Sequence, residues 1–272
     1  MTFTEFARDH GLILHSPIID GRWHRVPTED KRRKKNGAYI HHGDRAFLRN
    51  YATMLDFAVW RDGGRSPLYG NEARIVASSS NAEIRKRQQA ARDEAERLIA
   101  ECRRETHPYL VRKGFPGLCG LVHESGDLLV PMRDMQRYNV VNGVQRISAG
   151  GDKKFLTGSK AKGSVFRIGS KGPTWLVEGA ATGYTVELAL KESHQPGQVL
   201  VCFSASNLEH VSRYVARSNA FVFADADDAG ILAAASSGMP WCVGPDGMDA
   251  NDLFLESGIR PVVSLMMEAR GL

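Results

Sequence analysis

The chain has 272 residues, of which 42% are hydrophobic and 25% are charged, the usual composition of a globular protein. It contains no run of eighteen apolar residues and no signal-peptide pattern, so we expect a cytoplasmic protein with no membrane partner. The net charge of +5 favours a polyanionic partner.

Residues 1–75 predict a small basic N-terminal module. Phe3, Phe6 and Ala7 indicate a short helix, and the turn pair Asp20-Gly21 predicts a hairpin over residues 18–26. A basic run follows between Trp23 and Tyr39. Such a run is usually a solvated loop, but aromatic and cationic residues together also suit contact with single-stranded nucleic acid, and both interpretations stay open. The candidate contacts are Arg25, Lys31, Arg32, Arg33, Lys34 and Lys35.

A connector helix is predicted within residues 76–112. Ser80-Asn81-Ala82-Glu83 has the pattern of a capping box, so the helix should begin there and end near Arg104. Its thin apolar stripe predicts a helix lying on a domain surface.

Residues 113–172 predict a subdomain of short strands. Two apolar runs, 118–122 and 128–132, flank the turn Ser125-Gly126-Asp127. Basic residues on and after these strands outnumber acidic ones, which suits binding of nucleotide or template phosphates. The candidates are Arg133, Lys153, Lys154, Lys160 and Arg167.

Residues 173–272 have an α/β pattern in which carboxylates follow buried strands. Glu178 ends one apolar run, and Asp225 and Asp227 end another. Parallel strands bring their carboxyl ends to one edge of a sheet, so these carboxylates should meet there. Clustered carboxylates favour a hard cation such as Mg²⁺ or Mn²⁺, with Asp249 and Asp252 as further candidate ligands. A single Asp-x-Asp sequence is more often part of a loop or a helix cap. The metal site is favoured because three acidic motifs, at residues 178, 225–227 and 249–252, follow one another, each at the end of an apolar run.

None of the four cysteines forms a Cys-x-x-Cys pair or has a histidine at finger spacing, so no zinc is expected. Gly158-Ser159-Lys160-Ala161-Lys162-Gly163-Ser164 lacks the lysine of a phosphate-binding loop, and no such loop occurs elsewhere. A fused helicase is therefore not expected.

The motifs resemble the Toprim domain of DnaG-type DNA primases, topoisomerases and some nucleases. The resemblance lies in Val177-Glu178-Gly179, residues 225–230 and residues 249–252. Residues 178–183 are similar to the Glu-Gly-x-Ala-Thr variant of phage and plasmid primases. Thr182 stands where bacterial primases more often have an aspartate, so that auxiliary acid is absent. Residues 129–134 and 153–159 are similar to the two basic motifs upstream of Toprim in primases.

The resemblance implies an α/β fold, α+β overall, with a basic N-terminal subdomain joined by the helix to a Toprim domain with a mainly parallel sheet. It implies a primase that makes short RNA primers on single-stranded DNA from ribonucleoside triphosphates, with a separate replicative helicase as a further partner. Glu178, Asp225 and Asp227 would be catalytic, and Gly179 would let the backbone approach phosphates. A phage-encoded protein would act in the host cytoplasm. The alternatives are a Toprim nuclease and a non-catalytic DNA-binding scaffold.

Overall fold

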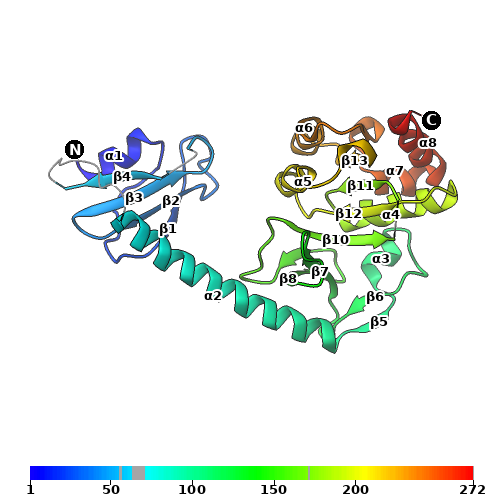
Figure 1. The fold of residues 1–272 in the computed structure, drawn as a ribbon, viewed down its shortest axis with the longest axis horizontal. Helices are drawn as coiled ribbons and strands as arrows, with labels where there is room; N and C mark the ends of the chain where they lie inside the picture. The colour runs from blue at the N-terminus through cyan, green and yellow to red at the C-terminus, as the bar shows by residue number, and fades with distance from the viewer. Residues whose placement is uncertain (55–56, 63–70, 171, 272) are drawn as a thin grey trace. The chain divides into compact units, whose positions relative to one another are not determined.

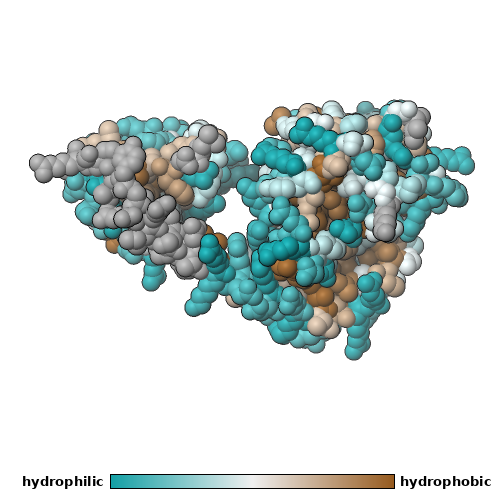
Figure 2. All heavy atoms as spheres, viewed as in Figure 1, coloured by the Kyte–Doolittle hydropathy of each residue, from teal (hydrophilic) through white to brown (hydrophobic). Residues whose placement is uncertain are grey.

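The structure is a computed structural model that describes residues 1–54, 57–62, 71–170 and 172–271, apart from the side chains of residues 71–83. Its contacts divide the chain into two compact units, Met1–Ser79 and Ser80–Leu272. In the view of Figure 2, hydrophilic residues make up most of the visible surface of the second unit, with smaller apolar areas among them. No helix among the described residues is long and apolar enough to cross a membrane.

The first unit is a four-stranded antiparallel sheet with one helix against it (Figure 1). Phe3 and Ala7 of the helix pack with Tyr39, Leu48 and Trp60 on one face of the sheet. Thr2 begins the helix with a capping box in which Glu5 is the reciprocal partner. The elements are α1 (Phe3–Asp9), β1 (His24–Val26), β2 (Gly37–His41), β3 (Arg45–Asn50) and β4 (Ala58–Arg61).

The short N-terminal helix is confirmed, but the hairpin over residues 18–26 is wrong. β1 pairs with β2, and no strand precedes Gly21 among the described residues. Asp20 turns the chain locally, because its carboxylate accepts hydrogen bonds from the Arg22 N–H and from His24. The hairpin therefore closes around the basic run Lys31–Lys35, which is exposed.

The connector helix is longer than expected. Helix α2 spans Asn71–Glu101, so the prediction that it begins at Ser80 is wrong, and the capping-box residues lie inside it. A capping-box pattern marks a helix start only when no helical turn precedes it. Beyond residue 84, Ala95 and Leu98 pack against Leu129, Val141 and Val144, so this part of the helix covers a sheet.

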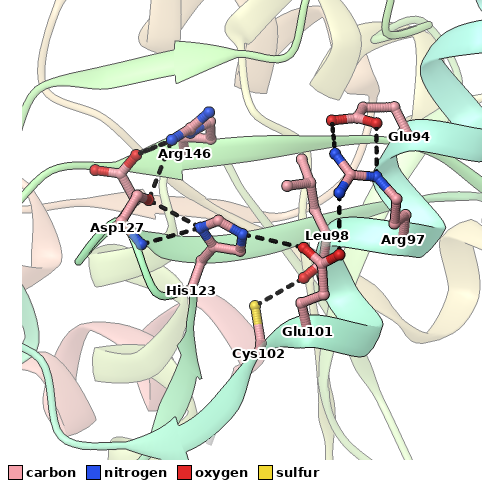
Figure 3. A network of polar contacts seen from close by, with 9 residues as sticks. Glu94, Arg97, Leu98, Glu101, Cys102, His123, Asp127 and Arg146 are labelled. Carbon is pink, nitrogen blue, oxygen red and sulfur yellow. Dashed lines mark hydrogen bonds and ion pairs between the residues drawn. The ribbon is translucent and has the colours of Figure 1, made fainter.

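Polar contacts also fix the end of α2 (Figure 3). Arg97 pairs with Glu94 at 2.7 Å and with Glu101 at 3.0 Å, and Glu101 also meets the imidazole of His123 at 3.4 Å. Arg146 pairs with Asp127 at 2.7 Å. The Arg146 guanidinium therefore links β8 to the turn between β6 and β7.

The second unit contains one continuous mixed sheet in the order β14-β13-β11-β12-β10-β7-β6-β5, with β8 and β9 added beyond β7. The predicted strands around the turn at residues 125–127 are confirmed as the antiparallel pair β6 and β7. The basic part comprises β5 (Arg103–Glu105), α3 (Pro108–Arg112), β6 (Gly120–Val122), β7 (Leu128–Asp134), β8 (Val141–Ile147), β9 (Lys153–Phe155) and β10 (Ser164–Gly169).

The C-terminal part has three layers around parallel strands (Figure 1). Alternate residues of these strands face opposite layers: Trp175 and Phe223 pack toward α4, α7 and α8, and Leu176 and Val222 toward α5 and α6. The mixed α/β fold class is thus confirmed. The elements are β11 (Thr174–Val177), α4 (Ala180–Glu192), β12 (Gln198–Val201), α5 (Ala205–Ser212), β13 (Ala220–Ala224), α6 (Asp228–Ser237), β14 (Trp241–Val243), α7 (Ala250–Ser257) and α8 (Ile259–Arg270).

Buried Asn207 joins the basic strands to the parallel part. Its amide nitrogen donates to the carbonyl oxygens of Ser164 at 2.8 Å and Cys202 at 2.7 Å, and its Oδ1 accepts from the Gly163 N–H at 2.8 Å. All three backbone groups lie near the antiparallel junction of β10 and β12.

Asn207→Ala should therefore lower the free energy of unfolding by about 2–4 kcal/mol, because three backbone groups lose their partner. Chemical denaturation measures this change. The matched control is Asn139→Ala, at an exposed asparagine, which should stay within about 0.5 kcal/mol of the unchanged protein. Equal effects of the two substitutions would contradict the role given to Asn207.

Candidate active site

Four carboxylates come together at the carboxyl edge of the parallel strands. Glu178 directly follows β11 and Asp225 directly follows β13, while Asp227 and Asp249 begin helices α6 and α7. Asp225 interacts electrostatically with the carboxylates of the other three. The structure thus places four of the five candidate metal ligands near enough to one another for their charges to interact.

Asp225 is the most perturbed of these acids. Burial, followed by repulsion from Glu178, Asp249 and Asp227, raises the pKa of its carboxyl from 3.8 to about 7. Its Oδ1 is buried and has no hydrogen-bond partner among the described residues. An unpartnered buried carboxylate oxygen of this kind can accept a proton or bind a cation.

The pKa of Glu178 is also raised, first by burial and then by repulsion from Asp227. Two contacts oppose the shift: a hydrogen bond from the Ala205 backbone N–H and the positive charge of Lys153. The Ala205 amide and the Lys153 charge therefore favour the ionised form of Glu178 and offset part of the upward shift.

Helix starts hold the remaining two carboxylates in place. Asp227 Oδ1 accepts a hydrogen bond from the Gly230 N–H at 2.7 Å, and Asp249 Oδ1 accepts from the Asp252 N–H at 2.8 Å. Gly230 allows α6 to start so close to the strand end, because a Cβ there would lie 2.4 Å from the Asp225 carbonyl oxygen. Each capping carboxylate keeps its second oxygen for another partner.

Asp252 has a different environment from the other four. Its carboxylate is exposed and forms an ion pair with Lys113 at 3.6 Å, and it is not among the charges that shift the pKa of Asp225 or Glu178. Its neighbour Asn251 is buried and donates to the Lys113 carbonyl oxygen at 2.9 Å. These contacts hold α7 against the end of α3.

The chemistry of the cluster fits a hard divalent cation, although no three His, Cys, Asp or Glu side chains among the described residues already converge as a complete ligand set. The available donors are carboxylate oxygens, which Mg²⁺ and Mn²⁺ prefer, and Mg²⁺ usually keeps several waters as ligands. Burial and then neighbouring negative charge raise the pKa values of Asp225 and Glu178, and a bound cation would offset the repulsion between the carboxylates.

Lys153 is the predicted basic residue that faces the carboxylates. Its charge lowers the pKa of both Glu178 and Asp225, and its Nζ lies 5.8 Å from the centre of the Tyr109 ring. A Cβ added to Gly179 would lie 4.0 Å from this Nζ. Gly179 has a negative φ of −102° and room for a Cβ, so the fold itself does not require glycine there.

A cavity of about 360 Å³ adjoins the carboxylates and is lined by cations. Arg112 and Lys113 from the end of α3 join Lys153 there, together with Tyr109. The Tyr109 hydroxyl is buried without a partner among the described residues, and burial raises its pKa to about 12. Sequence reasoning missed these α3 residues, although the pair Arg112-Lys113 ahead of Gly114 was a visible signal.

Phe203 was also missed. It follows β12 at the same edge, its N–H donates to the Glu178 carbonyl oxygen at 2.8 Å, and its φ of +68° is unusual for a bulky residue. Its ring contacts the exposed Phe155 edge-on, with ring centres 6.2 Å apart. Backbone strain of this kind leaves no trace in the sequence.

The other predicted basic residues have other partners. The guanidinium groups of Arg133 and Arg167 lie 5.6 and 4.2 Å from the centre of the Tyr138 ring, and Lys160 pairs with Asp134 at 3.6 Å. Lys154 lies opposite Arg146 on β8 and lines a separate cavity. Arg25 and the run Lys31–Lys35 belong to the first unit.

Sequence comparison identifies relatives of one functional class. Over 236 residues, or 77% of this chain, 26% of the residues are identical to a DNA primase TraC of Escherichia coli, and a second protein of that name and organism is 27% identical over 237 residues, or 78%. The chain resembles DNA primase TraC. It spans only 21% and 16% of the lengths of these two relatives. The expected similarity to DNA primases is thus confirmed, although no family model matches the chain.

Two solved primase structures are also similar to this chain. The primase fragment of the bacteriophage T7 primase-helicase protein gives a TM-score of 0.40 at 17% identity, covering 58% of this chain and 68% of that one. The RNA polymerase domain of Mycobacterium tuberculosis primase DnaG gives 0.36 at 19% identity, covering 72% and 83%.

The raised pKa of Asp225 predicts a pH-dependent stability. The folded protein keeps this proton up to about pH 7, whereas the unfolded chain loses it near pH 3.8, so the group's contribution to stability is full below pH 3.8 and is lost as the pH rises through 7. Asn mimics the protonated form. In a metal chelator, the stability advantage of Asp225→Asn over the unchanged protein should therefore grow between pH 5 and pH 8, by about 1–3 kcal/mol.

Thermal or chemical unfolding at the two pH values measures this difference. The control is Asp246→Asn, an exposed aspartate in the loop before α7, whose effect should not change with pH. An advantage of Asp225→Asn that is the same at both pH values would contradict the assignment.

Proposed function

We propose that this chain contains the catalytic centre of a DNA primase, which joins ribonucleotides into short primers on a single-stranded DNA template. The observation that carries the proposal is the cluster of Glu178, Asp225, Asp227 and Asp249 facing Lys153 and the cationic cavity. The similarity to DNA primase TraC over three quarters of the chain supports the same activity.

The carboxylates would hold divalent metal, either Mg²⁺ or Mn²⁺. When bound there, such a cation neutralises triphosphate charge and lowers the pKa of a coordinated hydroxyl. Asp225 and Glu178 would be its main ligands, because they are half-buried and repelled by neighbouring acids, and Asp227 and Asp249 would contribute their second oxygens. Asp252 would act through Lys113, whose position it fixes.

The cationic cavity would receive the triphosphate of the incoming ribonucleotide. Lys153 lies between this cavity and the carboxylates and would balance charge on both sides. Arg112 presents a planar donor group suited to phosphate oxygens. The helix start at Gly179 has no side-chain cap, so its N–H groups are available to an anion.

Glu178 is the candidate proton acceptor for the attacking primer hydroxyl. The pKa of its carboxyl is raised above that of an ordinary glutamate and so lies closer to neutral pH. A general base works best when its pKa lies near the working pH. Glu178 would thus have two roles, as a metal ligand and as the proton acceptor, whereas Asp225 would bind metal alone.

Primer synthesis tests the proposal. Purified protein, single-stranded templates of mixed sequence, labelled ribonucleotides and Mg²⁺ or Mn²⁺ should yield short oligoribonucleotides on a sequencing gel. Asp225→Asn and Asp227→Asn should each lower the yield at least about 100-fold, as expected for lost charge stabilisation in a transition state. Asp246→Asn should leave the yield unchanged.

Two outcomes would contradict the proposal. One is primer synthesis that persists in both substituted proteins, because the carboxylates would then not be catalytic. The other is template cleavage, without primer synthesis, that depends on the same aspartates, which would assign the centre to a nuclease.

A further inference from the structure

The first unit exposes aromatic rings and guanidinium groups on the face of its sheet opposite the core. The core face carries Tyr39, Leu48 and Trp60, against which α1 packs. Arg25 on β1 lies opposite Ala38 on β2, which in turn lies opposite Arg49 on β3, so these residues share the other face. Phe57 lies just before β4, level with Arg49.

These side chains form one connected row of contacts. The Trp23 and Phe57 rings lie 5.2 Å apart, and the Arg49 guanidinium lies 5.7 Å from the Phe57 ring and 5.0 Å from the Tyr51 ring. The Arg25 guanidinium lies over the same Tyr51 ring at 4.5 Å. We name this row, Trp23, Arg25, Arg49, Tyr51 and Phe57, the aromatic–arginine row.

The rings of the row are exposed to solvent and do not belong to the hydrophobic core of the first unit. Trp23, Tyr51 and Phe57 are 38%, 44% and 45% exposed, whereas Tyr39 and Trp60 on the opposite face are buried. Two guanidinium groups share the Tyr51 ring, and among the described residues no carboxylate forms an ion pair with either of them. The row therefore offers apolar ring faces together with unbalanced positive charge.

We propose that the aromatic–arginine row is a stacking surface for single-stranded DNA. Ring faces accept unpaired bases without regard to sequence, and arginines neutralise the phosphates between them. Duplex DNA hides its base faces and cannot stack in this way. The exposed run Lys31–Lys35, which connects β1 to β2, extends the positive charge of the same unit.

This inference rests on the proposed function, since it names a surface of the first unit that would hold the primase template. The earlier expectation of contact with single-stranded nucleic acid concerned the basic run and the aromatic residues that flank it, Trp23 and Tyr39. The new element is the set of exposed rings on the sheet, and the residues that decide it are Tyr51, Phe57 and Arg49.

Binding of the full-length chain to a labelled 20-nucleotide single-stranded DNA, followed by fluorescence anisotropy, tests the inference. Tyr51→Ala/Phe57→Ala should weaken binding at least ~5-fold, the effect of losing a single stacked base at the lower end of its usual contribution. Arg25→Gln/Arg49→Gln should weaken binding and flatten the salt dependence, by about 0.7 in the log–log slope for each arginine. Tyr51→Phe, which keeps the ring, should bind like the unchanged protein.

Matched controls separate this surface from general charge and from loss of fold. Arg8→Gln removes an exposed arginine of α1, on the core side of the sheet, and should leave binding within about twofold. Unchanged thermal midpoints would show that the variants remain folded. Asp225→Asn should bind DNA normally while failing to make primers, so failure of the row and failure of the proposed catalytic function are distinguishable.

The inference is overturned if folded Tyr51→Ala/Phe57→Ala binds the oligonucleotide as tightly as the unchanged protein. It is also overturned if Arg8→Gln weakens binding as much as the Arg25/Arg49 double variant, since only overall charge would then matter. Tighter binding of a single-stranded RNA of the same sequence through the same residues would reject DNA as the occupant.

Discussion

The gathering of four carboxylates at one edge of the sheet is the constraint on which the candidate site depends. Asp225 directly follows β13, and burial together with repulsion from three nearby acids raises the pKa of its carboxyl to about 7. The fold offsets part of this repulsion with Lys153, with the Ala205 N–H and with two helix starts. The remaining part is available for binding a cation.

The continuous sheet explains how distant parts of the chain reach this edge. β10 pairs with β7 on one side and with β12 on the other, so the basic strands and the parallel strands belong to one continuous sheet. Asn207 and Asn251 reinforce the junctions by bonding backbone groups of other elements. As a result, Lys153 and the end of α3 lie near carboxylates that are far from them in the sequence.

The sequence predicted best what depends on local pattern. Buried Val-rich and Phe-rich runs followed by carboxylates identified β11 and β13, and their parallel pairing brought Glu178 and Asp225 together as expected. The predicted start of α2 was wrong because a capping-box sequence can also lie within a longer helix. The predicted hairpin over residues 18–26 was wrong because an Asp-Gly pair can also form a turn that no strands flank. Phe203, Tyr109 and Arg112 could not be predicted, because their roles come from a positive φ and from contacts between remote elements. The ion pair of Asp252 could not be predicted for the same reason, because its partner Lys113 lies at the end of α3, far away in the sequence.

Direct cation binding is the most decisive test of the carboxylate centre. Titration of the metal-free chain with Mn²⁺ at pH 8, followed by calorimetry or electron paramagnetic resonance, should show saturable binding that Asp225→Asn weakens at least about tenfold and Asp246→Asn does not change. Binding that is equal in all three proteins, or absent from the unchanged protein in the presence of a nucleoside triphosphate, would contradict the account.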